Sequence, residues 1–66
     1  MQITLNGEKR EIPENYTVSD LLASVGINPD RVAVEHEGSI IRPEHFNHQE
    51  VQAGATVEII HFVGGG

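Results

Sequence analysis

The last three residues, Gly64, Gly65 and Gly66, directly follow an alternating apolar stretch over residues 56–63. Glycine has no side chain, so no Cβ crowds the carboxylate of Gly66, and the reactive group that this pattern suggests is the chain terminus itself. Terminal glycines can also be idle, because most chain ends fray. Composition alone favours the idle tail, so the rest of the sequence has to decide between the two interpretations.

Four histidines are the other side chains that could do chemistry. His45 and His48 have an i, i+3 spacing that suits a shared metal, but no third ligand stands out, so we expect surface histidines and no metal site. His36 and His61 fall on predicted strands. The chain has no cysteine, which excludes a disulfide, a thiolate metal site and a thiol nucleophile. No internal residue is therefore predicted to be catalytic, and no bound cofactor is expected.

Length and charge limit the partners that this chain can have. Its 66 residues suit one domain, near the lower size limit for a self-sufficient core. The net charge is −6, from 10 acidic residues against 4 lysines and arginines. An acidic surface repels phosphate groups, so we expect neither nucleic acid nor an anionic membrane as partner and favour a basic protein. Without a signal-peptide pattern or a membrane-spanning stretch, a cytoplasmic location is expected.

The elements that must position the glycine tail begin with a hairpin. Asn6-Gly7 separates two short runs between Ile3 and Ile12, and both of these turn residues tolerate positive φ. Thr17 then matches a helix N-cap, with Asp20 three residues later as a weak variant of the capping box. The apolar stripe of this helix has the spacing i, i+3, i+4, i+7. It consists of Val18, Leu21, Leu22 and Val25.

The second half of the chain predicts strands at 32–35, 40–41 and 56–63. One helix lying across one mixed sheet of four to five strands is the simplest way to bury the helical stripe, so the fold class is α+β. The predicted core of the sheet is Ile3, Leu5, Val32, Val34, Val57 and Ile59. If the first and last strands lie side by side and parallel, the fold is the ubiquitin-like β-grasp. We expect this domain over residues 1–63 and a flexible glycine tail over 64–66.

Side chains on the last strand alternate between the two faces of the sheet. Ile60 and Phe62 should therefore face away from the helix, together with Ile41. Apolar side chains on an otherwise exposed face predict a docking patch for a partner protein. A few exposed apolar residues are also ordinary in a small protein, which is the competing interpretation.

With these elements in order, the chain resembles the sulfur carrier proteins of thiamin (thiazole) biosynthesis over nearly its whole length. The resemblance rests on the segments 1–8, 17–22, 32–35 and 57–66. Three turns depart from the family pattern: Glu37-Gly38 replaces Asn-Gly, Arg42-Pro43 replaces Pro-Arg, and Gly54-Ala55 replaces Gly-Asp. Carriers of the molybdopterin pathway share the fold and the glycine terminus but are usually longer.

The resemblance implies a carrier protein that is a cosubstrate and not an enzyme. A separate adenylating, E1-like enzyme would use ATP and magnesium to form an acyl-adenylate on Gly66. Sulfur from a sulfur donor protein would then displace AMP and leave a thiocarboxylate, which thiazole synthase would receive. Gly64 and Gly65 would let the tail enter a narrow channel, and Ile41, Ile60 and Phe62 would dock on the activating enzyme.

Three other functions use the same features. A ubiquitin-like modifier would join its activated glycine to a lysine, and a carrier for another pathway, such as molybdopterin, would deliver sulfur elsewhere. A non-conjugating β-grasp binding module would leave the glycines idle. The intact mass of the protein from its native cell separates these cases, because sulfur in place of oxygen, a covalent adduct and an unmodified mass are different results.

Overall fold

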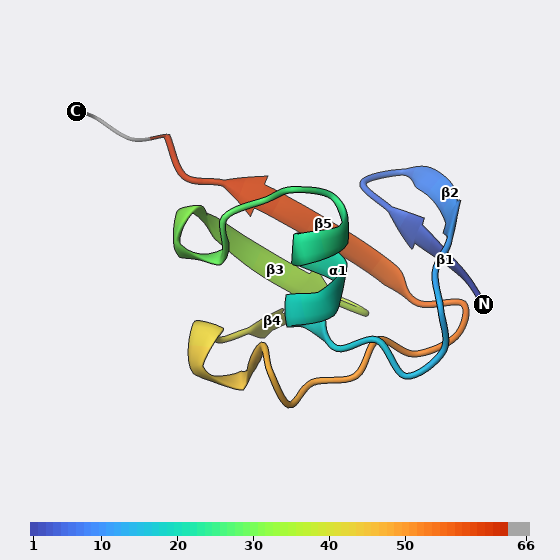
Figure 1. Cartoon of the computed structure of the whole chain (residues 1–66). Coiled ribbons are helices and arrows are strands. Elements are labelled where there is room, and N and C mark those ends of the chain that lie inside the picture. The colour runs from blue at the N-terminus through green and yellow to red at the C-terminus, as the bar shows by residue number, and fades with distance from the viewer. Residues whose placement is uncertain (64–66) are drawn as a thin grey trace.

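The computed structural model describes residues 1–63, which form one α-helix packed on one five-stranded sheet (Figure 1). Two short 3₁₀ helices, η1 and η2, lie in the connections. The elements in chain order are β1 (Gln2–Leu5), β2 (Glu8–Glu11), α1 (Val18–Ser24), η1 (Pro29–Arg31), β3 (Val32–His36), β4 (Ser39–Ile41), η2 (Pro43–His45) and β5 (Thr56–His61). The strand order is β2-β1-β5-β3-β4. β1 and β5 are parallel neighbours, while the other pairs are antiparallel. The predicted β-grasp fold is therefore confirmed, with a mixed sheet of five strands.

Both hairpin turns use residues with positive φ. Asn6 and Gly7 have φ of 48° and 84°, as their sequence predicts for a tight turn between β1 and β2. Glu37 and Gly38, between β3 and β4, have φ of 51° and 82°. A glutamate is unusual in this conformation, but its carboxylate accepts a hydrogen bond of 2.7 Å from the N–H group of Thr56. This bond joins the β3–β4 turn to the start of β5.

Helix α1 begins as the sequence predicts. The Thr17 hydroxyl accepts from the N–H group of Asp20 at 3.2 Å, and the Asp20 carboxylate accepts from the N–H group of Thr17 at 3.0 Å, so the capping box is complete. Gly26 ends the helix with φ of 73°. At seven residues, α1 is too short to be stable alone, and its packing on the sheet has to hold it.

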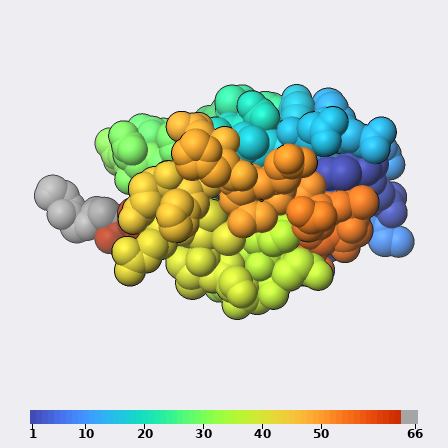
Figure 2. Space-filling view, turned by 90° about the horizontal axis from the view of Figure 1, so that it is seen from below, coloured from blue at the N-terminus to red at the C-terminus, as the bar shows by residue number. Residues whose placement is uncertain are grey.

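The core lies between α1 and the sheet. Every predicted core residue is buried except Val25, which is half-buried at the helix C-terminus. Four further buried apolar residues were not among those predicted: Ile12, Phe46, Val51 and Ala55. Three of these belong to the segment between β4 and β5, which is polar and irregular in sequence. In Figure 2 this segment, in yellow and orange, covers one side of the molecule between the helix and the β3–β4 region.

The same segment supplies hydrogen-bond acceptors for the first turn of α1. The N–H groups of Val18 and Ser19 donate to the carbonyl oxygens of Gln49 and Phe46, at 2.9 and 3.0 Å. These N–H groups have no acceptor within the helix, so without the segment they would be left without a hydrogen bond.

Among residues 1–63, no helix is long and apolar enough to cross a membrane.

Candidate functional site

Strand β5 is the element that leads to the glycine residues, and it lies at the centre of the sheet. The side chains of Val57 and Ile59 are buried against the helix, whereas Ile60 and Phe62 are 46% and 61% exposed. Beyond the strand, the N–H group of Phe62 still donates to the carbonyl of Arg31 at 3.0 Å, so pairing with the β3 side continues past His61. Val63 is fully exposed. The described chain thus leaves the folded body from a fixed, central strand.

The sheet face away from α1 carries an apolar patch, as predicted, but one of its members is different. In an antiparallel pair, residues directly opposite each other share a face of the sheet. Ile41 lies opposite the buried Val34 and packs against the core, so its predicted place on the exposed face is wrong. Ile40 lies opposite Glu35 and is 60% exposed. We call Ile40, Ile60 and Phe62 the open-face patch.

Two carboxylates lie next to the open-face patch. Glu35 on β3 is directly opposite Glu58 on β5, and the register places Ile40 on the other side of Glu35. Like charges in directly opposite positions destabilise a sheet, by about 0.2–1 kcal/mol for each such pair. A partner that presents a cation between Glu35 and Glu58 would remove this repulsion. The face is therefore suited to a partner surface that is apolar and basic.

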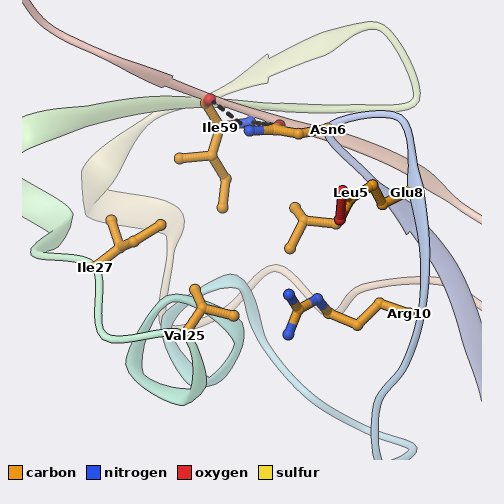
Figure 3. Close-up of a pocket in the computed structure, with 7 residues that line it drawn as sticks. All are labelled: Leu5, Asn6, Glu8, Arg10, Val25, Ile27 and Ile59. Atoms are coloured by element: carbon orange, nitrogen blue, oxygen red, sulfur yellow. Dashed lines mark hydrogen bonds between the residues drawn. The ribbon is translucent and has the colours of Figure 1, made fainter.

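On the helix side, a pocket of about 260 Å³ lies between the β1–β2 hairpin and the end of β5 (Figure 3). Its lining is four aliphatic side chains, one guanidinium, one carboxylate and one amide, from Leu5, Val25, Ile27, Ile59, Arg10, Glu8 and Asn6. Arg10 and Glu8 belong to β2 and lie opposite Ile3 and Leu5, which explains why two charged side chains are on the helix side. The sequence did not predict this pocket, because the charged pattern of β2 shows no apolar face.

The histidines do not form a metal site in the described chain. His45 and His48 are exposed, and residues 1–63 contain no group of three or more histidine, cysteine, aspartate or glutamate side chains that could hold a metal ion. His36 is buried on β3, where its Nε2 atom accepts from the N–H group of Gln52 at 3.2 Å. This hydrogen bond ties the loop before β5 to strand β3.

The predicted site of the chemistry, Gly66, and the predicted tail-recognition residues, Gly64 and Gly65, lie outside the described residues. What the structure provides is their point of attachment, at the end of β5. The open-face patch and the pocket lie on opposite faces of the sheet at this end of the strand, since Ile60 belongs to one and Ile59 to the other.

Comparisons with known proteins give a consistent result. The model of the ThiS family matches residues 3–66. A thiazole synthase of Paramagnetospirillum magneticum is 35% identical over all 66 residues, which are 20% of that protein, so the chain spans about a fifth of its length. The sulfur carrier protein ThiS of Bacillus subtilis is 42% identical over 50 residues, 76% of each chain. The crystal structure of the thiamine biosynthesis protein ThiS from Geobacter metallireducens is 32% identical, with a TM-score of 0.88 over both whole chains.

Proposed function

The chain belongs to the ThiS family, as its sequence pattern predicts, and from this premise we propose that it is a sulfur carrier protein of thiamine biosynthesis. In this function the chain is a protein cosubstrate and not an enzyme. The observation that carries the proposal is the path of β5, which runs through the sheet centre and leads to a fully exposed Val63. The core holds the strand in place, and the residues that follow are left for a partner.

The chemistry we propose takes place at the carboxylate of Gly66. A carboxylate is ionised at neutral pH and is a poor electrophile, so it needs activation. An adenylating, E1-like enzyme supplies this with ATP and magnesium: a carboxylate oxygen attacks the α-phosphorus, and pyrophosphate leaves. The outer sulfur of a persulfide on a sulfur donor protein then attacks the acyl carbon and displaces AMP, which forms an acyl disulfide. A thiol cleaves this disulfide, which leaves the thiocarboxylate on Gly66 and a new disulfide on the donor side. We place the reaction in the cytoplasm, where ATP is available to the activating enzyme.

Gly64 and Gly65 fit this chemistry because a residue without a Cβ atom can pass through a narrow channel. An extended chain advances about 3.3–3.6 Å per residue, so three glycines reach roughly 10 Å beyond Val63. That distance is enough to bring the carboxylate into a recessed site while the folded domain stays outside. The channel would contact backbone groups only, which explains why the tail needs no side chain.

We propose that thiazole synthase receives the sulfur. The support is the thiazole synthase of Paramagnetospirillum magneticum, in which a segment 35% identical to this whole chain belongs to the same polypeptide. Two proteins that work together are often joined in this way, whereas a general protein modifier has no reason to be joined to one such enzyme. The same observation favours the thiazole pathway over the molybdopterin pathway.

The open-face patch is proposed as the docking surface for the activating enzyme. Its three members, Ile40, Ile60 and Phe62, are 46–61% exposed although they are large and apolar. The neighbouring pair Glu35 and Glu58 adds a negative charge that a basic partner can neutralise. With a net charge of −6, the whole chain would be steered toward such a partner.

Intact mass spectrometry tests the proposed function. The chain is incubated with an adenylating enzyme, ATP, magnesium, a persulfide donor and a thiol reductant. Its mass is compared with that of the untreated chain, and the protein from its native cell is measured in the same way. We expect replacement of one oxygen by sulfur at Gly66, located by fragmentation. Covalent adducts to lysines of other proteins would instead establish a ubiquitin-like modifier. A mass that never changes, with no adenylate formed, would leave a non-conjugating binding module.

A further inference from the structure

The two edges of β5 differ in how far they are paired. Residues 56 and 62 hydrogen bond toward the β3 side, since the N–H group of Phe62 donates to Arg31 and the carbonyl of Thr56 accepts from Glu37. The odd-numbered residues point their backbone groups the other way. Val57 accepts from the N–H group of Asn6 at 2.9 Å, and Ile59 is paired by the Asn6 side chain. The next odd-numbered residue on this edge is His61.

Nothing in the described chain pairs with His61 on that edge. β1 ends at Leu5, opposite Val57, and the chain turns away at Asn6-Gly7. Within residues 1–63, β1 pairs with β5 only as far as Val57, and no backbone hydrogen bond from a turn or loop reaches His61 from the β1 side. An exposed row of such groups is a template for an additional strand. The open segment of the β5 edge starts directly after Ile59 and continues toward the glycine residues.

The pocket on the helix side lies beside this open edge. Ile59 lines the pocket, and so does Asn6, whose side chain covers the backbone of Ile59 (Figure 3). Successive side chains of an added strand would alternate between the two faces of the sheet. One side chain on the helix side would therefore enter the pocket, where the aliphatic groups of Leu5, Val25 and Ile27 would surround it. Edge and pocket together form one strand-accepting site.

We propose that the activating enzyme adds an extended segment to the β5 edge at His61 and inserts an aliphatic side chain into the pocket. This inference rests on the proposed function. An enzyme that holds the carboxylate of Gly66 must cover the chain after Val63. Gly66 is five positions after His61, or roughly 17 Å of extended chain. A strand of the enzyme paired at His61 would continue the pairing that β1 and Asn6 provide up to Ile59. It would thereby direct the residues after Val63 toward the enzyme.

A second copy of this chain fits the edge less well. Each copy carries a net charge of −6, so two copies repel each other. Antiparallel pairing centred on His61 would place Val63 of the second copy opposite Ile59. The N–H and C=O groups of Ile59 are already hydrogen bonded to Asn6, at 2.7 and 3.2 Å. Self-pairing would therefore have to break these two hydrogen bonds, which an enzyme segment placed further along the edge leaves intact.

The test compares two variants at one position, in binding to an adenylating enzyme that adenylates the wild-type chain. His61→Pro removes the outward N–H group but keeps the pairing with β3, and proline is tolerated where the N–H group faces away from a ladder. His61→Ala removes the side chain and keeps the N–H group, so it is the reference against which His61→Pro is compared. We expect His61→Pro to bind on the order of tenfold more weakly than His61→Ala, about the value of one hydrogen bond. Ile27→Trp fills the pocket and should weaken binding as well.

Amide hydrogen exchange measured by NMR gives a readout that does not depend on substitution. We expect the His61 amide to exchange fast in the free chain and slowly in the complex, while the Ile59 amide is protected in both. Unchanged exchange at His61 in a complex that forms the adenylate would overturn strand addition and leave the proposed function standing. Protection that appears in the free chain as its concentration rises would also overturn it, in favour of a second copy. A wild-type chain that no such enzyme adenylates contradicts the proposed function instead.

Discussion

The side chain of Asn6 pairs with the backbone of Ile59 as a neighbouring strand would. Its Oδ1 atom accepts from the N–H group of Ile59 at 2.7 Å, and its Nδ2 group donates to the carbonyl of Ile59 at 3.2 Å. Asn6 also holds the left-handed turn position that ends β1, with φ of 48°. One residue thus closes the β1–β2 hairpin and determines where the free edge of β5 begins.

Substitution of Asn6 should therefore destabilise the fold through β5. Asn6→Gly keeps the positive φ and removes both hydrogen bonds, so we expect a loss of about 1–3 kcal/mol in the free energy of unfolding. Asn6→Ala should lose more, because alanine adds strain in the left-handed region. Urea unfolding followed by circular dichroism measures both values. Equal stability of Asn6→Gly and wild type would show that water replaces the amide at no cost.

Glu37 allows a similar comparison at the other hairpin. Its φ of 51° is unfavourable for a glutamate, yet its carboxylate accepts from Thr56 at 2.7 Å. Glu37→Ala keeps the strain and removes this bond, so a loss of about 0.5–1.5 kcal/mol is expected. Glu37→Gly removes strain and bond together and should be less destabilising than Glu37→Ala. The order of the two thermal midpoints checks the strain, and a reversed order would mean that the left-handed conformation costs alanine less than the added backbone freedom costs glycine. If Glu37→Ala is as stable as wild type, the hydrogen bond contributes nothing.

Two phenylalanines with different burial test the description of the core. Phe46 is 2% exposed and Phe62 is 61% exposed. Phe46→Ala should cost about 3–5 kcal/mol, which is a large share of the stability of a small domain, and it should also loosen the acceptors at the start of α1. Phe62→Ala should change the free energy of unfolding by less than about 0.5 kcal/mol, since exposed positions tolerate substitution. Equal losses would contradict the assigned burial.

The sequence predicted the helix and most strands because the patterns that mark them are local, whereas the parallel pairing of the first and last strands was expected from known folds. The Asn6-Gly7 turn, the Thr17 cap and the alternation of Val57 and Ile59 each depend on neighbours within a few residues. Ile40 and Ile41 show the limit of this approach. Two adjacent isoleucines give no alternation, and only the register with β3 decides that Ile41 faces the core and Ile40 the open face.

Contacts between distant segments could not be predicted from local patterns. Asn6 and Ile59 are 53 positions apart, so nothing in the sequence near Asn6 shows that its side-chain amide makes two hydrogen bonds to the backbone of Ile59. Phe46 stands alone among polar residues, with no periodic apolar partners to mark it as buried. The pocket depends on both kinds of contact, because it forms only where the hairpin, α1 and β5 meet.

Docking on the open face can be tested with one added charge. Phe62→Asp places a carboxylate in the open-face patch, so we expect at least tenfold weaker binding to the activating enzyme while the fold is kept. Ala53→Asp adds the same charge in the exposed turn before β5, at the other end of this strand, and should bind as wild type. Titration calorimetry measures both. Equal affinities for the two variants would remove the open face from the interface.

Chemistry at Gly66 makes a prediction about the position of a single carboxylate. One alanine added after Gly66 moves the carboxylate by one residue, about 3.3–3.6 Å, and introduces a Cβ atom where the enzyme channel accommodates glycine. The addition lies beyond the core that ends with β5, so the variant should unfold at the wild-type urea concentration.

Adenylation of this extended chain, measured by exchange of pyrophosphate into ATP, should nevertheless fall to background, and no thiocarboxylate should form. Gly65→Val is the companion variant, because it adds bulk to the tail and leaves the carboxylate in place. It should bind through the folded domain and react slowly. If the alanine-extended chain is thiocarboxylated at the wild-type rate, with intact mass showing that no residue has been trimmed, then the carboxylate of Gly66 is not the group that the enzyme selects.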